Sequence, residues 1–330
     1  DGAMTVLKIA IVFFVVIVGF FYVKASNFTP FIPPSQPAST VEGSSAVTGV
    51  MTQPLWQFAT GMTPSVYGVP GILSGAALVF FAFIGFDVVA TASEETKNPH
   101  KNVPLGIGVG MLLIIVMYML VAVVTTGMVS YADLAKQDSP SLATAFELVG
   151  ADWAAKIISF GIVLGLATVV MVLLLGLTRI VFAMSRDGLL PRGLSKTGKH
   201  GTPAALQIVV GAVVALVAAF FDIGVLSDMV NIGTLSAFTL VAISIPIMRK
   251  KRPDLPRAFK MPGSPWIPIL IAVANFWLML NLSVLTWIRF VVWLVVGFAI
   301  YFGYGYWHAR LGKGDLTETL SAETDKAVNG

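Results

Sequence analysis

One apolar segment, from about Pro70 to Ala92, carries the residue types best suited to bind a solute. Its middle reads Phe80-Phe81-Ala82-Phe83-Ile84-Gly85-Phe86-Asp87, where a glycine and a carboxylate interrupt a run of aromatic residues. An ionised aspartate near the middle of a membrane span costs roughly 2.5–3.5 kcal/mol on insertion scales, so Asp87 is expected to face a cavity or a partner. Gly85 loosens the helix, so that backbone carbonyls can turn toward a ligand. The pattern predicts a binding site inside a membrane.

The composition of the chain is that of an integral membrane protein. Hydrophobic residues make up 56% of the 330 residues and charged residues 12%, with a mean hydropathy of +0.86. Soluble chains carry about 25% charged residues. The absence of cysteine excludes disulfides and cysteine-ligated zinc or iron–sulfur clusters, and the three histidines lie near predicted helix ends. The pI of about 9.2 comes from basic residues in short loops, which membrane orientation explains better than nucleic-acid binding.

The elements that must position the site are membrane-spanning helices. A helix needs roughly 20 apolar residues to cross the hydrocarbon core. On that criterion we expect an all-α integral membrane fold over residues 1–312, with about eight spans. Proline stands at three predicted starts, Pro104, Pro203 and Pro265, where its missing N–H costs nothing. The predicted spans are residues 4–23, 70–92, 104–129, 155–183, 203–221, 225–248, 266–285 and 288–307.

Lysine and arginine residues in the connecting loops predict the orientation. Twelve of them lie in the loops after the second, fourth and sixth spans, and four lie in the opposite segments. Cytoplasmic loops are enriched in basic residues, so the first set is assigned to the cytoplasmic side of the plasma (inner) membrane. Both chain ends are then cytoplasmic, and residues 24–69 and 130–154 lie outside.

The sequences of the loops and of the two chain ends support four further predictions. Residues 24–69 are rich in Pro, Ser, Thr and Gly and predict a long, partly mobile external loop. Residues 142–149 predict a short helix over the outer face, either a lid or an inert loop helix. The polar residues 313–330 predict a disordered cytoplasmic tail. The chain opens on Asp1-Gly2-Ala3-Met4 close to a span, so we expect a chain with no signal peptide that is truncated at its N-terminus, with Met4 as an alternative start.

Several loop motifs go beyond what membrane proteins share in general. Together with residues 80–87, they resemble the amino acid–polyamine–organocation transporters, and most closely the cationic amino-acid transporter family within that superfamily. The resemblance covers residues 4–312, and it is specific because independent motifs occur in the same order. The motifs are Glu94-Glu95-Thr96-Lys97-Asn98-Pro99 with Lys101-Asn102-Val103-Pro104, Ser185-Arg186-Asp187-Gly188-Leu189-Leu190-Pro191, Asn231-Ile232-Gly233-Thr234-Leu235, and Arg252-Pro253-Asp254-Leu255-Pro256-Arg257.

This resemblance implies a fold of twelve spans, built from two inverted five-helix repeats and two additional helices. The eight spans look like the family's fifth to twelfth, so the second repeat is complete and the first is mostly missing. The family's unwound first helix, whose glycine-rich backbone holds the substrate carboxylate, is then outside this chain. We therefore expect a partial inverted-repeat fold and an inactive fragment.

The resemblance also implies that the helix is discontinuous at Gly85. Carbonyls exposed at the break would accept hydrogen bonds from the α-ammonium group of a substrate, since an ammonium offers three donors. Phe81 would shield the ligand as a gate. The alternative is that these aromatic residues only pack or face lipid. The carbonyls concerned belong to Phe80, Phe81, Ala82 and Ile84.

Four further residues receive roles from the resemblance. Asp87 either caps backbone or pairs with a basic residue of the complete protein, or it binds a cationic substrate side chain directly. Lys8 matches a lysine whose ammonium replaces a sodium ion in some relatives, so its reversible protonation would couple proton entry to uptake. A lysine near a helix end can instead reach the interface along its own stem. Tyr118 and Met171 would line the pocket around the substrate side chain, where a methionine favours small or neutral side chains, or they only pack.

These features together predict a secondary active amino-acid transporter with proton-coupled uptake by alternating access. Transport of polyamines or other organic amines and sodium-independent exchange of amino acids are the alternatives. A membrane enzyme would need a cluster of acid and base residues within the spans, and only Lys8 and Asp87 lie well inside them, too few for a catalytic set. A channel would need rings of filter residues, which the sequence does not show. We expect an amino acid, protons and lipid as partners and no cofactor or metal; a membrane-protein partner or a homo-oligomer stays open.

Overall fold

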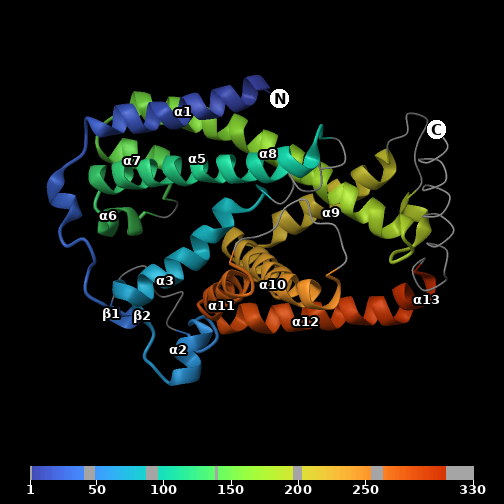
Figure 1. Cartoon of the computed structure of the whole chain (residues 1–330). Coiled ribbons are helices and arrows are strands. Elements are labelled where there is room, and N and C mark those ends of the chain that lie inside the picture. Colours follow the sequence, from blue (N-terminus) through green and yellow to red (C-terminus); the bar gives the residue numbers. More distant parts are fainter. Residues whose placement is uncertain are drawn as a thin grey trace. The chain divides into compact units, whose positions relative to one another are not determined.

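The computed structural model describes residues 2–40, 49–86, 96–137, 140–195, 203–253 and 263–309, which are mostly helical (Figure 1). The chain divides into two compact units. The first unit comprises residues 1–170 and 227–287, and the second comprises residues 171–226 and 288–330. Each boundary between the units falls inside a helix.

Within the described residues, an apolar helix overlaps each of the eight predicted spans. These helices are α1 (Gly2–Phe20), α3 (Gly68–Val79), α5 (Pro99–Met128), α8 (Asp152–Arg186), α9 (Ala204–Phe220), α10 (Ile223–Lys251), α11 (Trp266–Leu280) and α12 (Val284–Ile300). Of these, α3 covers only the first part of the span predicted at residues 70–92. Short helices connect or extend them: η1 (Ala25–Phe28), η2 (Ala38–Thr40), α2 (Leu55–Thr60), η4 (Phe80–Phe83), α6 (Tyr131–Ala135), α7 (Leu142–Leu148), η6 (Arg192–Ser195), the π-helical η7 (Tyr301–Gly305) and α13 (Tyr306–His308). Two short strands, β1 (Gln36–Pro37) and β2 (Ser65–Val66), depart from the expected all-α fold.

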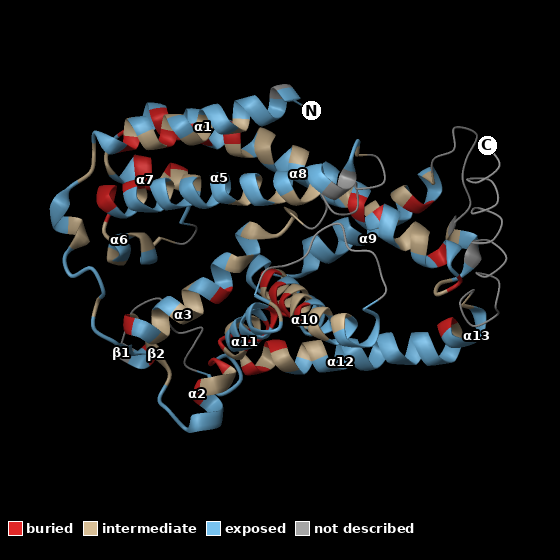
Figure 2. Cartoon of the chain, viewed as in Figure 1, coloured by how far each residue is buried: buried red, intermediate tan, exposed pale blue. Residues whose placement is uncertain are grey.

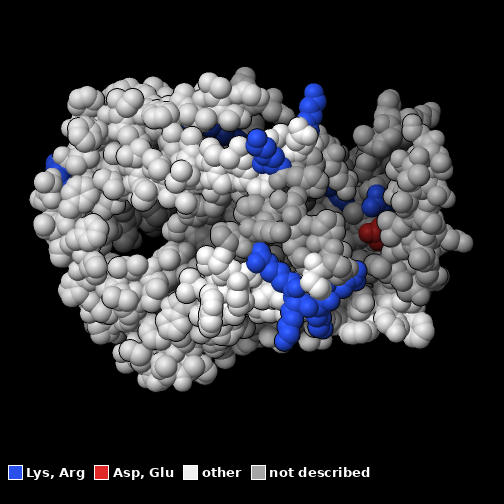
Figure 3. Space-filling model, in the orientation of Figure 1, with Lys and Arg blue, Asp and Glu red and all other residues white. Residues whose placement is uncertain are grey.

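The apolar helices identify a multi-pass membrane protein. By length and composition, four helices can cross a membrane within the part of the chain that the structure describes: most of α5, all of α8 and α10, and α12 continued through η7 and α13. Only 6% of the most apolar stretch of α5 is buried inside the protein. Figure 2 shows the same for other long helices, whose surfaces are largely exposed. Most of the face in Figure 3 carries neither basic nor acidic side chains, as expected of a surface that meets lipid.

Two predicted helix boundaries are wrong. α5 begins at Pro99, after Asn98 in a left-handed conformation, and Pro104 lies inside the helix instead of at its start. The turn between α11 and α12 lies at residues 281–283, earlier than predicted, because local side chains fix it there. Asn281 Nδ2 donates to the Trp277 carbonyl (2.8 Å), and Ser283 Oγ accepts from the backbone N–H of Thr286 (3.2 Å). Pro203 and Pro265 do precede α9 and α11 directly.

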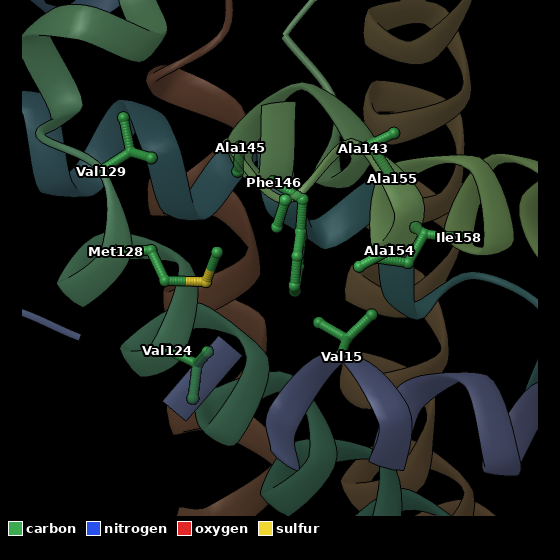
Figure 4. Packing of buried hydrophobic residues seen from close by; sticks show 11 residues of the cluster. Val15, Val124, Met128, Val129, Ala143, Ala145, Phe146, Ala154, Ala155 and Ile158 are labelled. Atoms are coloured by element: carbon green, nitrogen blue, oxygen red, sulfur yellow. The ribbon is translucent and has the colours of Figure 1, made fainter. Parts of the chain in front are cut away.

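The core of the first unit lies where α1, α5, α7 and the first part of α8 meet (Figure 4). Phe146 of α7 is fully buried at its centre, and Val15 of α1 points toward it. Gly19 of α1 permits this packing, because an added Cβ would meet Met128 Sδ at 2.7 Å. The short helix predicted at residues 142–149 is present as α7, and one of its faces, with Phe146, packs into this core.

The segment between α1 and α3 has more local structure than the sequence suggested. Gln36 pairs with Val66 in the antiparallel ladder of β1 and β2. Further along, Leu55 N–H donates to the Leu282 carbonyl (3.0 Å) and Val284 N–H donates to the Gln53 carbonyl (3.1 Å). These bonds attach the segment to the turn between α11 and α12, so it is part of the first unit.

The second unit contains the remainder of α8, α9 and the end of α12 with η7 and α13. Leu174 of α8 lies beside Gly211 of α9, with 3.8 Å between the leucine side chain and an added Cβ. Ser185 Oγ donates to the Pro191 carbonyl (2.7 Å), which holds the turn after α8. Gly188 in this turn has a φ of +83° and lies against the backbone of His308, so glycine is required there.

Candidate functional site

The apolar segment that carries the aromatic run is interrupted, as the sequence predicts. α3 ends at Val79 and tightens into the 3₁₀ turn η4. Ile84 is extended (ψ 138°), Gly85 has a φ of +122°, and Phe86 returns to a helical conformation. L-residues with a side chain rarely adopt the φ of Gly85, so glycine makes the break possible. The segment is thus a discontinuous helix, the form in which backbone groups become available to a ligand.

Side chains from two other helices hold the backbone on both sides of the break. Asn231 of α10 donates from Nδ2 to the carbonyls of Ala77 (3.1 Å) and Leu78 (3.5 Å). Tyr118 of α5 donates its hydroxyl to the Ala82 carbonyl (2.8 Å). The break is therefore fastened to α10 before it and to α5 at its centre.

The carbonyls expected to await a ligand are not all free of hydrogen bonds within the protein. The Ile84 N–H donates to the Phe81 carbonyl (3.2 Å), and the Ala82 carbonyl accepts from Tyr118. A carbonyl oxygen has two lone pairs, so each retains capacity for a second donor. The expectation of exposed carbonyls needs this correction: those of Phe81 and Ala82 are oriented by the protein before any ligand arrives.

Aromatic rings surround the break. Phe83 lies edge-on to Tyr118, with ring centroids 5.0 Å apart. Phe238 of α10 lies between Phe80 (6.1 Å) and Phe86 (5.4 Å). Phe81 is 43% exposed, unlike its neighbour Phe80, which is half-buried. Phe81 is thus the most exposed ring among Phe80, Phe81 and Phe83.

The structure brings some predicted site residues together and leaves others apart. Phe80, Ala82 and Tyr118 meet around the break. Asp87 lies outside the described residues. Met171 belongs to the second unit, where it is a 61% exposed residue of α8.

Lys8 lies on α1, half-buried, with its stem against α8. The side-chain atoms Cε and Cγ would be 3.9 and 4.0 Å from a Cβ at Gly165, and Ile11 one turn on fills the space above Gly161. Two glycines four residues apart thus give α8 a groove that receives α1. The methylene stem of Lys8 occupies this groove.

Sequence reasoning missed Asn231 and Phe238 as site residues. Asn231 was noticed only as part of a family motif, although it is fully buried, and its Oδ1 accepts no hydrogen bond from any residue that the structure describes. An asparagine inside an apolar span was the available signal, because buried amides need partners. Phe238 carried no signal, since one phenylalanine among many apolar residues does not reveal its neighbours.

A helical membrane protein with an interrupted apolar helix, oriented carbonyls and a surrounding set of aromatic rings has the architecture of a solute carrier. Residues 3–305 match the sequence profile described as amino acid permease, and the chain belongs to this family. The family falls within the superfamily that the motifs resemble. The break at Gly85 therefore lies in the fold for which a discontinuous helix was expected.

Known relatives carry the names of transporters. The branched-chain amino acid permease BcaP of Bacillus subtilis is 42% identical over 314 residues, which are 95% of this chain and 60% of that protein. The methylthioribose transporter of Bacillus subtilis is 38% identical over 314 residues, with the same shares of 95% and 60%. The cationic amino acid transporter 3, mitochondrial, of Arabidopsis thaliana is 45% identical over 195 residues, 59% of this chain and 31% of that protein. The chain spans about 60% of the length of the first two relatives. Family and relatives indicate a transporter and not an enzyme.

Proposed function

We propose that this chain forms the larger part of a secondary active amino-acid transporter that binds the substrate α-ammonium group at the break in α3. The observation that carries the proposal is the break itself, with Ile84 extended and Gly85 at a φ of +122°. An ammonium group has three donors, and the oriented carbonyls of the break supply acceptors with remaining capacity. Membership of the amino acid permease family supports the substrate class.

The wall of the proposed site would consist of the aromatic rings around the break. Phe81, the exposed ring, is proposed to close over the substrate, while the packed rings of Phe80 and Phe83 stay in place. Alternating access requires a site that opens to each side in turn. Tyr118 would hold the Ala82 carbonyl of this site in one orientation through its hydrogen bond. Asp87 stays a proposal from the resemblance, as a backbone cap, a charge partner or a ligand of a cationic substrate side chain. Met171 stays a proposal as a pocket residue that favours small or neutral side chains.

We further propose that uptake is coupled to protons through Lys8, in a plasma (inner) membrane with both ends of the chain cytoplasmic. Contact of the Lys8 stem with Gly165 supports the coupling role, because it links a titratable group on α1 to a long helix that passes into the second unit. The proposed orientation is supported by basic residues in the last turn of α10, namely Arg249, Lys250 and Lys251. We also propose that residues 1–330 alone do not transport, because they correspond to about 60% of the relatives' length.

The names of the relatives suggest more than one candidate substrate for this protein. A branched-chain amino acid is the first candidate, because the permease BcaP matches 95% of the chain. Methylthioribose, which has no amino group, is a second candidate because its transporter matches the same share at 38% identity. Organic amines, and amino acids moved by sodium-independent exchange, are further candidates. A substrate without an ammonium group would not use the acceptors at the break, so transport assays discriminate between these solutes.

Counterflow of radiolabelled L-leucine into proteoliposomes that contain the full-length protein tests the proposal. We expect labelled leucine to accumulate against internal unlabelled leucine, and unlabelled arginine, putrescine and methylthioribose to reveal by competition which class is accepted. Accumulation that only methylthioribose inhibits, or no counterflow of any of these solutes, would contradict an amino-acid carrier.

A matched pair of glycine variants tests the role of the break. Gly85→Ala and Gly75→Ala make the same chemical change, and an added Cβ meets nothing within 4 Å at either position. Of the two, only Gly85 has a positive φ, and a backbone conformation that L-residues rarely adopt costs about 1–3 kcal/mol. We expect Gly85→Ala to lower counterflow about ten-fold and Gly75→Ala to leave it unchanged. Equal activities of the two variants would show that the break is not the site.

A further inference from the structure

A second pocket, separate from the break, lies within the first unit. Its volume is about 670 Å³, and none of residues 80–85 lines it. Its walls are α3, from Gly68 to Leu78, Asp228 near the start of α10 and the turn between α11 and α12, together with loop residues and α6. Most of the lining is apolar, including Val66, Ile72, Leu78 and Leu282. Such a pocket fits the apolar body of a small organic solute.

One wall of this pocket presents a carboxylate that is held in place. Asp228 Oδ2 accepts a hydrogen bond from Thr286 Oγ1 (3.1 Å), and Thr286 is fully buried. Ser283 Oγ lies 2.7 Å from the same Thr286 oxygen. Because the Thr286 hydroxyl donates its one hydrogen to Asp228, Ser283 is the donor to Thr286. This relay fixes the direction of the Asp228 carboxylate, and both Asp228 and Ser283 line the pocket.

The turn between α11 and α12 adds a second acceptor. Asn281 is 5% exposed and lines the same pocket. Its Nδ2 donates to the Trp277 carbonyl (2.8 Å), which fixes the orientation of the amide. Its buried Oδ1 accepts no hydrogen bond from the residues that the structure describes. A buried amide oxygen without a donor is costly, so a donor from a bound molecule is expected.

Two aromatic rings complete the pocket. Tyr67, at the start of α3, and Tyr131 of α6 both line it, and their rings meet edge-on with centroids 5.2 Å apart. Aromatic faces attract cations as well as apolar groups. The polar groups so far identified therefore favour a positively charged donor over an anion.

We propose that this pocket binds a small organic primary amine, with its ammonium group between Asp228 and Asn281 and its apolar body against Ile72 and Leu78. The pocket is an amine-recognition site distinct from the break in α3. Movement of the same amine from this pocket to the break would rest on the proposed transport function; binding in the pocket does not. Leu78, which lines the pocket and whose carbonyl accepts from Asn231, joins the two sites along α3.

The test uses a single cysteine as a reporter in the full-length protein, in detergent and on a cysteine-free background. Ser74→Cys places a thiol in the lining of the pocket, and Ser26→Cys places a control thiol on exposed η1, outside it. The rate of labelling by a maleimide is measured with isoamylamine, with 4-methylvalerate and with L-leucine. We expect isoamylamine and leucine to slow labelling of Ser74→Cys about five-fold or more, 4-methylvalerate to have no effect, and the control to be unaffected.

Two aspartate variants test the charge. Asp228→Asn keeps an acceptor for Thr286 and removes the negative charge, so the isoamylamine concentration that half-protects Ser74→Cys should rise about ten-fold. Asp222→Asn, an exposed aspartate near the start of the same helix, should leave it unchanged. Circular dichroism spectra and elution profiles identical to those of the parent show that both variants are folded.

The outcomes separate this inference from the proposed transport function. Equal protection by 4-methylvalerate, protection by none of the three solutes, or a Ser74→Cys thiol that does not react at all would each overturn the amine site. Protection that persists in a protein without leucine counterflow would retain the amine site and reject the transport proposal. Counterflow without protection would do the reverse.

Discussion

Single polar side chains hold the backbone around the break that follows α3, where the helix loses its own hydrogen bonds. Asn231 donates to the carbonyls of Ala77 and Leu78, and Tyr118 donates to that of Ala82. In an apolar environment no water would replace these donors. The two side chains thus stabilise an irregular backbone that Gly85 makes possible.

Removal of Asn231 should destabilise the full-length protein. Asn231→Ala removes a donor from the buried Ala77 carbonyl, which costs about 1–3 kcal/mol, so we expect the midpoint of thermal unfolding in detergent to fall by several degrees. The control is Ser244→Ala on the exposed face of the same helix, whose hydroxyl bonds only to the Val241 carbonyl. An Asn231→Ala protein as stable as the control would show that the amide does not fasten α3.

Lys8 can be tested without disturbing its packing. Lys8→Met keeps an unbranched flexible stem against Gly165 and removes the ammonium group. We expect leucine counterflow to persist and uptake driven by an imposed proton gradient to be lost, as measured with a pH-sensitive dye inside proteoliposomes. Lys24→Met, at an exposed lysine after α1, should change neither. Proton-driven uptake that survives in Lys8→Met would reject the coupling role.

At the scale of elements, the packing of α1 on α8 depends on two glycines with different tolerances. A Cβ at Gly161 would overlap the side chain of Ile11, whereas a Cβ at Gly165 would lie at an ordinary contact distance from Lys8 (3.9 Å). Helices approach closely in membranes where small residues line the contact. Gly161 therefore sets the distance between the helices, and Gly165 provides space for the lysine stem.

This difference predicts opposite outcomes for two identical substitutions. Gly161→Ala should push α1 from α8 and lower thermal stability by about 1–3 kcal/mol, as overpacking does. Gly165→Ala should leave stability within about 0.5 kcal/mol of the parent, the range of a substitution that touches little. The double variant Ile11→Ala/Gly161→Ala should recover part of the loss. Additive losses in the double variant would contradict the proposed contact.

At the scale of the whole molecule, exposed apolar side chains dominate the long helices, as Leu112 of α5 and Phe160 of α8 show with 65% and 69% exposure. A surface of this kind is stable only when lipid or further protein covers it. Basic residues gather in the last turn of α10. This cluster marks that end of α10 as a part that meets water.

The proposed orientation can be tested with single cysteines in intact cells. Ser26→Cys, after α1, should react with a membrane-impermeant maleimide from outside, because the loop after α1 is proposed to be external. Lys250→Cys, in the last turn of α10, should react only after the cells are permeabilised. The opposite pattern would invert the orientation, and reaction of both thiols from outside would exclude it.

Much of the fold follows from patterns that are local in sequence. Apolar stretches of sufficient length located eight helices, and the Gly85 motif located the break, because both depend on neighbouring residues. The prediction of a helix start failed where two prolines close in sequence could each begin the helix. Pro104 had the features of a helix start, yet Pro99 with Asn98 before it took that position. The helix at residues 142–149 was predicted, but its packing through Phe146 into the core was not, because that depends on contacts with other helices.

The amino-acid composition established that this protein lies in a membrane, because hydropathy and charge are properties of composition. The resemblance of residues 80–87 to a transporter family then predicted the break at Gly85, where glycine accepts a positive φ readily. Tertiary structure alone decided which side chains stabilise the break. Asn231 is 154 residues from Ala77, and Tyr118 is 36 residues from Ala82. Hydrogen bonds over such separations depend on how helices pack, and packing is a property of the folded chain that no local pattern contains.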